Sequence, residues 1–197
     1  MIIKKFSDID KINNNTKILF IKKCRDFENS KPLPFLEKLK ELTIKGNYDE
    51  SLDNLENTVL TRLYIDGKFN NKLDKLPITL KYLTIIGDFS HELNNLPNFL
   101  EILQISCRFN NNLDNLPNQL KKLKITCYTN YNRPLDFLPN SLIIFILDSL
   151  SFNHLLDNLP SSLEYCKISF DKNYFEKFPN LKKNLPKKIK TLYLNYY

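Results

Sequence analysis

Residues 69–125 read FNNKLDKLPITLKYLTIIGD (69–88), FSHELNNLPNFLEILQISCR (89–108) and FNNNLDNLPNQLKKLKI (109–125). The three lines are nearly one phrase, in which an aromatic residue is followed by Leu-Pro and then by Leu-x-x-Leu-x-Ile. Pro77, Pro97 and Pro117 stand 20 residues apart. A period this short and regular is typical of a solenoid, in which each repeat forms one coil that stacks on the next.

The Leu-x-Ile part of the phrase recurs from residue 36 onwards. Its alternation predicts a strand with one buried face, and equivalent strands of neighbouring coils should pair in parallel. A proline stands six residues ahead of six of these strands and excludes a continuous helix there, so the return side should be extended or 3₁₀. We therefore predict a repeat solenoid of about eight coils, each of 20–26 residues, with one parallel β-sheet. The first residue of each Leu-x-Ile copy is Leu42, Leu63, Leu83, Leu103, Leu123, Phe145, Cys166 or Leu192.

Three further columns of equivalent residues follow the strands. A small residue stands where the backbone should turn inward: Gly46, Gly67, Gly87, Cys107, Cys127 and Ser149. An aromatic residue follows it and should stack on its equivalents inside the coil: Tyr48, Phe69, Phe89, Phe109, Tyr131 and Phe152. The next residue should bond the backbone of a neighbouring coil: Asn70, Ser90, Asn110, Asn132 and Asn153.

Leu80-x-x-Leu83-x-Ile85 and its copies resemble the strand signature of leucine-rich repeats. The whole phrase is similar to the FNIP repeat, a leucine-rich-like repeat of amoebae and of the giant viruses that infect them. Residues 131–142 form the copy nearest to that family's pattern, and the resemblance covers residues 36–195. It implies a leucine-rich-repeat-like fold for one continuous repeat domain, residues 36–197.

Residues 1–35 fit the repeat poorly, and we predict that they form an N-terminal cap, because a solenoid needs its terminal coil covered. Ser7 and Asp8 could cap a short helix that carries Ile9 and Ile12, and residues 17–22 read as a strand. The alternative is the remnant of a separate N-terminal module.

The composition predicts a cytoplasmic protein, which would lie in the host-cell cytoplasm if the chain is viral. The 197 residues hold no apolar run long enough for a signal peptide or a membrane span. The four cysteines are irregularly spaced, which favours a reducing compartment. The net charge of +7 would permit an acidic partner, although a lysine-rich solvated surface also explains it and is the favoured interpretation.

No residue pattern indicates catalysis. His91 and His154 occupy equivalent turns three coils apart, about 14 Å, which is too far for one zinc ion. Cys107 and Cys127 share a position in adjacent coils and are either a disulfide or two buried small residues. One acid per coil indicates turn geometry: Asp53, Asp74, Asp114, Asp136 and Asp157. We expect no enzyme activity, no cofactor and no metal.

The residues that the strands direct away from the core are not repeated. Apolar side chains gather there in two groups, which suggests a protein-binding face, although strands favour such residues in any case. The candidate partner-binding face comprises Tyr64, Tyr82, Ile86, Ile102, Gln104, Ile144, Ile146, Tyr165 and Tyr193.

Lysines gather towards the end of the chain, at Lys172, Lys177, Lys182, Lys183, Lys187, Lys188 and Lys190. With the nearby Tyr193, Tyr196 and Tyr197 they could bind nucleic acid through phosphate contacts and base stacking. Alternatively, they keep the last strand from pairing with another chain. A third possibility is self-association through the edge strand that carries Tyr193.

Overall fold

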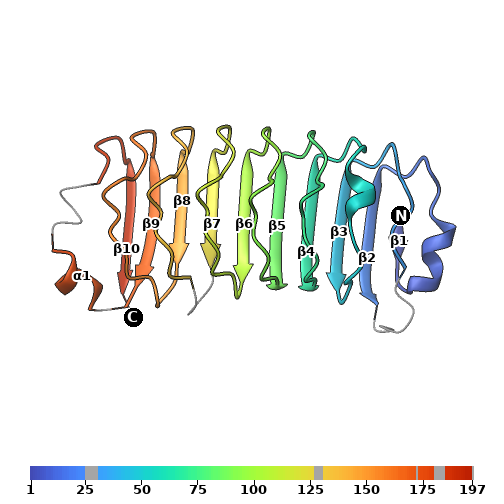
Figure 1. Ribbon diagram of the computed structural model, residues 1–197, viewed down its shortest axis with the longest axis horizontal. Coiled ribbons are helices and arrows are strands. Elements are labelled where there is room, and N and C mark those ends of the chain that lie inside the picture. The colour runs from blue at the N-terminus through green and yellow to red at the C-terminus, as the bar shows by residue number, and fades with distance from the viewer. Residues whose placement is uncertain (25–30, 127–130, 172, 180–184, 197) are drawn as a thin grey trace.

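In the computed structural model, the described residues are 1–24, 31–126, 131–171, 173–179 and 185–196. Within them, ten strands form a single sheet in sequence order, so that neighbours in the chain are neighbours in space (Figure 1). The strands are β1 (Ile2–Ile3), β2 (Ile18–Cys24), β3 (Glu41–Gly46), β4 (Arg62–Lys68), β5 (Tyr82–Asp88), β6 (Ile102–Cys107), β7 (Lys122–Thr126), β8 (Ile144–Asp148), β9 (Tyr165–Phe170) and β10 (Thr191–Tyr196).

Every strand pair is parallel, and the pairing aligns the predicted equivalent positions. Leu63 of β4 lies beside Leu42 on one side and Leu83 on the other, and the same column continues to Leu192 of β10. The predicted solenoid fold is therefore confirmed for β3 to β10. The strand predicted at residues 17–22 is confirmed as β2, and its Leu19 pairs with Leu42, so β2 adds a rung that the Leu-x-Ile column did not include.

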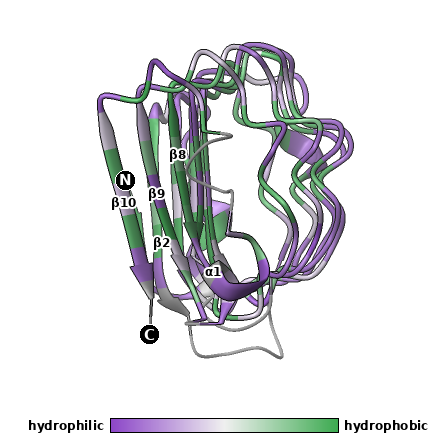
Figure 2. Ribbon diagram, turned by 90° about the vertical axis from the view of Figure 1, so that its left-hand side faces the viewer, coloured by the Kyte–Doolittle hydropathy of each residue, from purple (hydrophilic) through white to green (hydrophobic). Residues whose placement is uncertain are grey.

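The return segments form a second layer that faces the sheet across a core of leucine, isoleucine and aromatic side chains (Figure 2). Each turn after the proline closes with one hydrogen bond, as from the Leu80 amide to the Pro77 carbonyl at 3.0 Å. A 3₁₀ helix, η3 (Asp53–Leu55), occupies one return segment. The prediction of an extended or 3₁₀ return side is confirmed, because the single α-helix of the described residues, α1 (Tyr174–Lys177), lies in the long connection before β10.

The glycine column exists because successive backbones nearly touch. Gly67 and Gly87 have φ angles of +147° and +106°. A Cβ atom on Gly67 would lie 2.0 Å from the carbonyl oxygen of Gly46. Further along the column Cys107 and Ser149 are buried, which agrees with the prediction of small residues; Cys127 lies outside the described residues.

The aromatic residues stack into a continuous spine, as predicted. Ring centroids are 6.4 Å apart for Phe69 and Phe89, 6.5 Å for Phe89 and Phe109, and 6.3 Å for Phe109 and Tyr131. The rings are nearly parallel, and Phe152 follows Tyr131 at 6.4 Å. The spine fills the coil at the end of the strands where the chain turns.

The asparagine column forms a ladder of hydrogen bonds between coils. The Asn110 side-chain oxygen accepts a bond from the Asn132 amide at 2.8 Å, and Asn132 accepts one from the Asn153 amide at 2.9 Å. Asn70 accepts from the Ser90 amide in the same way, at 3.0 Å. These bonds satisfy turn amides that have no partner in the sheet, which is the predicted role of the column.

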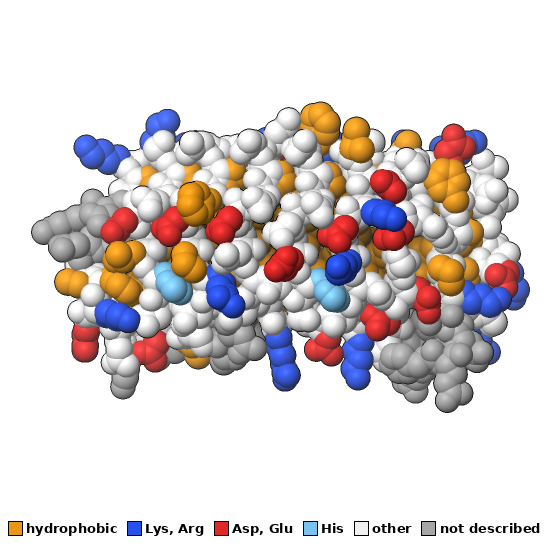
Figure 3. All heavy atoms as spheres, in the orientation of Figure 1, with side chains coloured by type: hydrophobic (Ala, Val, Ile, Leu, Met, Phe, Trp, Pro, Cys, Tyr) orange, Lys and Arg blue, Asp and Glu red, His pale blue; other side chains and the backbone are white. Residues whose placement is uncertain are grey.

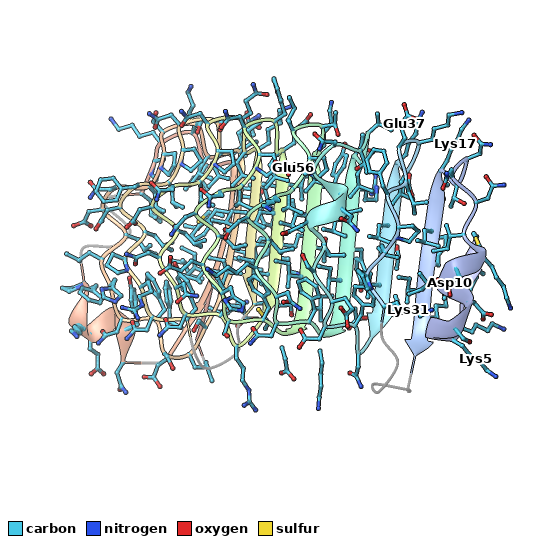
Figure 4. All side chains as sticks on the ribbon, turned by 45° about the vertical axis from the view of Figure 1, so that its right-hand side comes forward. Lys5, Asp10, Lys17, Lys31, Glu37 and Glu56 are labelled. Atoms are coloured by element: carbon cyan, nitrogen blue, oxygen red, sulfur yellow. The ribbon has the colours of Figure 1, made fainter. Side chains whose placement is uncertain are left out.

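The N-terminal helical segment differs from the prediction. It is a 3₁₀ helix, η1 (Phe6–Lys11), which begins after Lys5 and has no side-chain cap. The prediction of Ser7 and Asp8 as caps was wrong, because the Asp8 carboxylate instead accepts a hydrogen bond from Lys11 at 2.7 Å. Ile9 and Ile12 are both buried in the core. Asp10 of η1 pairs with Lys31 at 2.7 Å and connects the segment to the next coil (Figure 4).

The domain boundary at residue 35 stays a prediction, and β1 and β2 continue the sheet.

An aromatic cluster closes the other end of the spine. Tyr174 of α1 lies 6.2 Å from Phe152 and stacks on Phe170 at 3.9 Å, while Phe178 lies 4.7 Å from Tyr174. The Tyr174 hydroxyl donates to the His154 carbonyl at 2.6 Å. This cluster was not predicted, because it comes from a connection that follows no repeat.

Candidate functional site

The outer face of the sheet is the surface that the strands turn away from the core. Along each strand from β4 to β8, inward residues are buried and the residues between them are partly or fully exposed. All nine residues predicted as a partner-binding face are outward. Eight are partly buried by neighbours one strand away, and Tyr193 is 50% exposed. Whether they bind a partner stays a prediction.

In the first half of this face, on β3 to β6, two cations are covered by aromatic rings. The Arg62 guanidinium lies 4.4 Å from the centre of the Tyr82 ring, and the Lys45 ammonium lies 5.2 Å from the Tyr64 ring. The Tyr64 hydroxyl donates to the Asp66 carboxylate at 3.4 Å. Burial, together with the charge of Asp66, raises the pKa of Tyr64. Cation–π contacts of this kind hold both partners in place on the surface.

Ile102 and Ile86 complete the first apolar group. Ile102 lies beside Tyr82 in the sheet, and Ile86 lies beside Asp66. Gln104 is two residues along β6 from Ile102 and therefore shares its face.

The second apolar group lies on β8 to β10. Ile144 is the neighbour of Tyr165, and Ile146 is the neighbour of Lys167, which in turn lies beside Tyr193. The rings of Tyr165 and Tyr193 are 5.9 Å apart and tilted by 50°. The sheet thus brings together residues up to 49 positions apart in the sequence, from Ile144 to Tyr193.

Two lysines of β7 separate the two apolar groups. Lys122 lies between Ile102 and Ile144, and Lys124 lies between Gln104 and Ile146. The sequence pattern placed both lysines outward but did not include them in the candidate face. The signal that could have found them is their central position between the two apolar groups.

The histidines belong to the turns, as predicted. The Nε2 atoms of His91 and His154 lie 2.6 Å and 3.3 Å from the carbonyl oxygens of Asn70 and Asn132, so each ring nitrogen donates to the coil before it. Two histidine side chains are seen well apart on one face, among a row of acidic side chains (Figure 3). Among the described residues, no three His, Cys, Asp or Glu side chains form a group that could hold a metal ion.

The acidic column also serves the turns. Asp74 accepts a hydrogen bond from Asn95 at 3.2 Å, and Asp136 accepts one from Asn158 at 3.1 Å. A polar groove of about 450 Å³ runs past Asp74 and His91. Apart from Lys72, its lining side chains already bond one another or the coil before them, so the groove follows from the repeat geometry.

The cysteines that can be placed are buried in the core. Cys107 lies in the column of small residues, and Cys166 takes the place of a core leucine. Burial raises the pKa of the Cys166 thiol to about 12. The proposed pair of Cys107 and Cys127 cannot be followed, since Cys127 lies outside the described residues.

The C-terminal lysines are only partly described, since Lys172, Lys182 and Lys183 lie outside the described residues. Lys177 donates to the Asn153 side chain at 2.9 Å, and Lys190 pairs with Glu164 at 2.8 Å. Nucleic-acid binding by this segment and self-association through β10 both stay predictions.

Comparisons with known proteins show the fold. No family model matches the sequence, and no curated protein matches it. Among solved structures, the chain is similar to CroV588, whose crystal structure is described as a novel circular LRR protein structure. The TM-score is 0.62 at 22% sequence identity, and the match covers 98% of this chain and 32% of that one. The chain thus spans about a third of the length of CroV588, and it has a leucine-rich-repeat-like fold. The closer resemblance to the FNIP repeat stays a prediction.

No helix of the described residues combines the length and the hydrophobicity that a membrane span requires.

Proposed function

We propose that this chain is a non-enzymatic protein–protein interaction module that binds its partner through the outer face of the sheet. Leucine-rich-repeat-like solenoids generally mediate protein interactions, and their repeated strands build extended binding surfaces. The observation that carries the proposal is the outer face itself. It holds two groups of large apolar side chains, including Tyr82, Ile102, Ile146 and Tyr165, at positions that the fold leaves free to vary.

The composition of the face supports a protein partner. Tyrosine and isoleucine offer apolar area, and tyrosine and arginine are enriched in protein interfaces. Arg62 is already held over the Tyr82 ring, so part of the cost of ordering these side chains on binding is removed.

The proposal is tested by capture experiments with two matched variants. Tyr82→Asp with Ile102→Asp places two carboxylates in the first apolar group of the outer face. Ile78→Asp with Phe99→Asp makes the same change at exposed apolar residues of the return side, which are 68% and 48% exposed. Both proteins should keep their circular dichroism and melting behaviour, since none of the four side chains belongs to the core.

The outer-face variant should lose the proteins that the unchanged chain captures from a lysate, and the return-side variant should keep them. Equal capture by the outer-face variant, or equal loss from the return-side variant, would show that the outer face is not the binding surface.

A further inference from the structure

We infer that the partner binds with an acidic segment, whose carboxylates meet Lys122, Lys124 and Lys167 and whose flanking apolar side chains meet the isoleucines beside them. This inference rests on the proposed function, because it names the chemistry of the partner for the same face.

The three lysines lie close together on the outer face. Lys122 and Lys124 are two residues apart on β7, about 6.6 Å along one strand face. Lys167 is level with Lys124 two strands away, which is about 9.6 Å. The flexible four-carbon stem of lysine allows all three ammonium groups to reach the same one or two carboxylates.

These lysines differ from two cations of β3 and β4 and from two lysines just ahead of β5 and β7. Lys45 and Arg62 lie over tyrosine rings, and Lys81 and Lys121 both pair with Glu101, at 3.2 Å and 2.9 Å. For Lys122, Lys124 and Lys167, the described part of the chain provides no ion pair, hydrogen bond or ring contact, although all three are partly buried. Partly buried cations that form no ion pair repel one another, so an arriving carboxylate relieves that repulsion.

The charge of this region is positive. The outward positions of β7, β8 and β9 carry three lysines and one carboxylate, that of Asp148, which gives +3 − 1 = +2. Glu164, at the start of β9, is already paired with Lys190. An acidic segment is therefore the electrostatic complement of this part of the face.

The side chains around the lysines favour a protein segment over a nucleic acid. Ile102 and Ile144 flank Lys122, and Ile146 lies between Lys124 and Lys167. These isoleucines offer no ring for base stacking, on which single-stranded nucleic-acid sites depend. The Tyr193 ring lies beside Lys167 but not beside Lys122 or Lys124, and Asp148 would repel phosphates. Aliphatic side chains that flank the acidic residue of the partner would cover the isoleucines. Because they exclude water, each lysine–carboxylate contact becomes stronger.

The test uses a phage-displayed library of random peptides as the probe, selected on the full chain. Selected peptides should be enriched in Asp and Glu flanked by apolar residues. A synthetic copy of the strongest peptide should bind the Lys122→Gln, Lys124→Gln, Lys167→Gln variant at least about tenfold more weakly, since three partly buried ion pairs are lost. A control variant, Lys121→Gln, Lys187→Gln, Lys188→Gln, removes three exposed lysines that lie outside the strands and should bind as the unchanged chain does.

Three results would overturn the inference. The first is a set of selected peptides that are not enriched in Asp or Glu but fail to bind the Tyr82→Asp, Ile102→Asp variant. The outer face would then still bind a protein partner, but that partner would not be acidic. The second is a set of peptides that bind the triple lysine variant and the Tyr82→Asp, Ile102→Asp variant as tightly as the unchanged chain. This result would also contradict the proposed function. The third is a random single-stranded oligonucleotide that binds through these lysines while no selected peptide depends on them.

Discussion

The two faces of the same strands follow opposite rules. On the inner face of β6, Leu103 and Ile105 repeat the residues of β5 and β7, and all of them are at most 1% exposed. On the outer face of the same strand, Ile102 and Gln104 have Tyr82 and Thr84 on one side and Lys122 and Lys124 on the other. The difference arises because every coil offers its inner residues the same neighbours, whereas the outer residues meet only solvent and the adjacent outer residues.

The comparison teaches how to interpret a repeated residue in this molecule. Asn110 and Asp74 resemble functional polar groups when they are seen once, but each bonds to the adjacent coil and recurs for that reason. An outward residue that does not recur from coil to coil, such as Lys124, makes no such bond to the adjacent coil. Functional residues are therefore expected at the outward positions that differ from coil to coil.

The largest effect is expected for Gly67→Ala on the inner side of the coil. The added Cβ would meet the Gly46 carbonyl oxygen at 2.0 Å, and the φ angle of +147° is strained for alanine. The loss of unfolding free energy should exceed about 4 kcal/mol. Urea denaturation measures it, with the exposed Lys68→Ala as the control. Unchanged stability would mean that the coils are further apart than described.

The next largest effect is expected for Phe109→Ala, which removes a ring stacked between Phe89 and Tyr131. The cost should be about 3–5 kcal/mol, since the rings on both sides cannot collapse into the cavity. Phe99→Ala is the matched control, because Phe99 is 48% exposed on the return side. The comparison fails if both substitutions lower the unfolding free energy equally.

A smaller effect should come from alkaline pH. Burial raises the pKa of Cys166 from 9.0 to about 12, so between these values the folded chain keeps a proton that the unfolded chain loses. The stability due to this group is complete below pH 9 and declines above it, by about 1.4 kcal/mol per pH unit. Denaturation at pH 8 and 10 should show a steeper decline for the unchanged chain than for Cys166→Ala. Parallel declines would place this thiol in contact with water.

Loss of one bond in the asparagine ladder should cost less. Asn110→Ala leaves the Asn132 amide without its 2.8 Å acceptor, and about 1 kcal/mol of unfolding free energy should be lost. Asn112→Ala, at an exposed position in the same turn, serves as the control. Hydrogen exchange of the Asn132 amide should also become faster, and an unchanged exchange rate would argue against the ladder.

The smallest effect is expected on the outer face. Gln104→Ala should change the unfolding free energy by less than about 0.5 kcal/mol, whereas Ile105→Ala, one residue further, should cost about 2–5 kcal/mol. Thermal denaturation of the two variants compares adjacent positions of one strand. Similar costs would mean that the outer face contributes to the core.

The sequence predicted the repeat well where local signals agree. The recurring Leu-x-Ile alternation gave the correct pairing from Leu42 to Leu192, and from Leu83 onwards a proline six residues ahead marks each copy. The pattern was less informative at the N-terminal end. A strand was predicted at residues 17–22, but not that its Leu19 and Ile21 join the same columns, and the caps assigned to η1 were wrong.

Other features could not be predicted because they depend on side chains brought together from different coils. Tyr174 closes the aromatic spine only because the connection before β10 folds back onto Phe152 and Phe170. Arg62 lies over Tyr82, 20 residues later, because the two are neighbours in the sheet. Neither contact recurs from coil to coil, so no repeated residue in the sequence indicates it.

By itself, the sequence determined the solenoid, its strand order and the columns that fill it, since a 20-residue period presents the same local chemistry to every coil. The tertiary structure decided what the variable residues do, because only the stacked strands show which outward side chains are neighbours. It covered Lys45 and Arg62 with rings and left Lys122, Lys124 and Lys167 partly buried among isoleucines without an ion pair. That arrangement depends on which outward residues the neighbouring coils place side by side, and the repeated part of the sequence does not specify these residues.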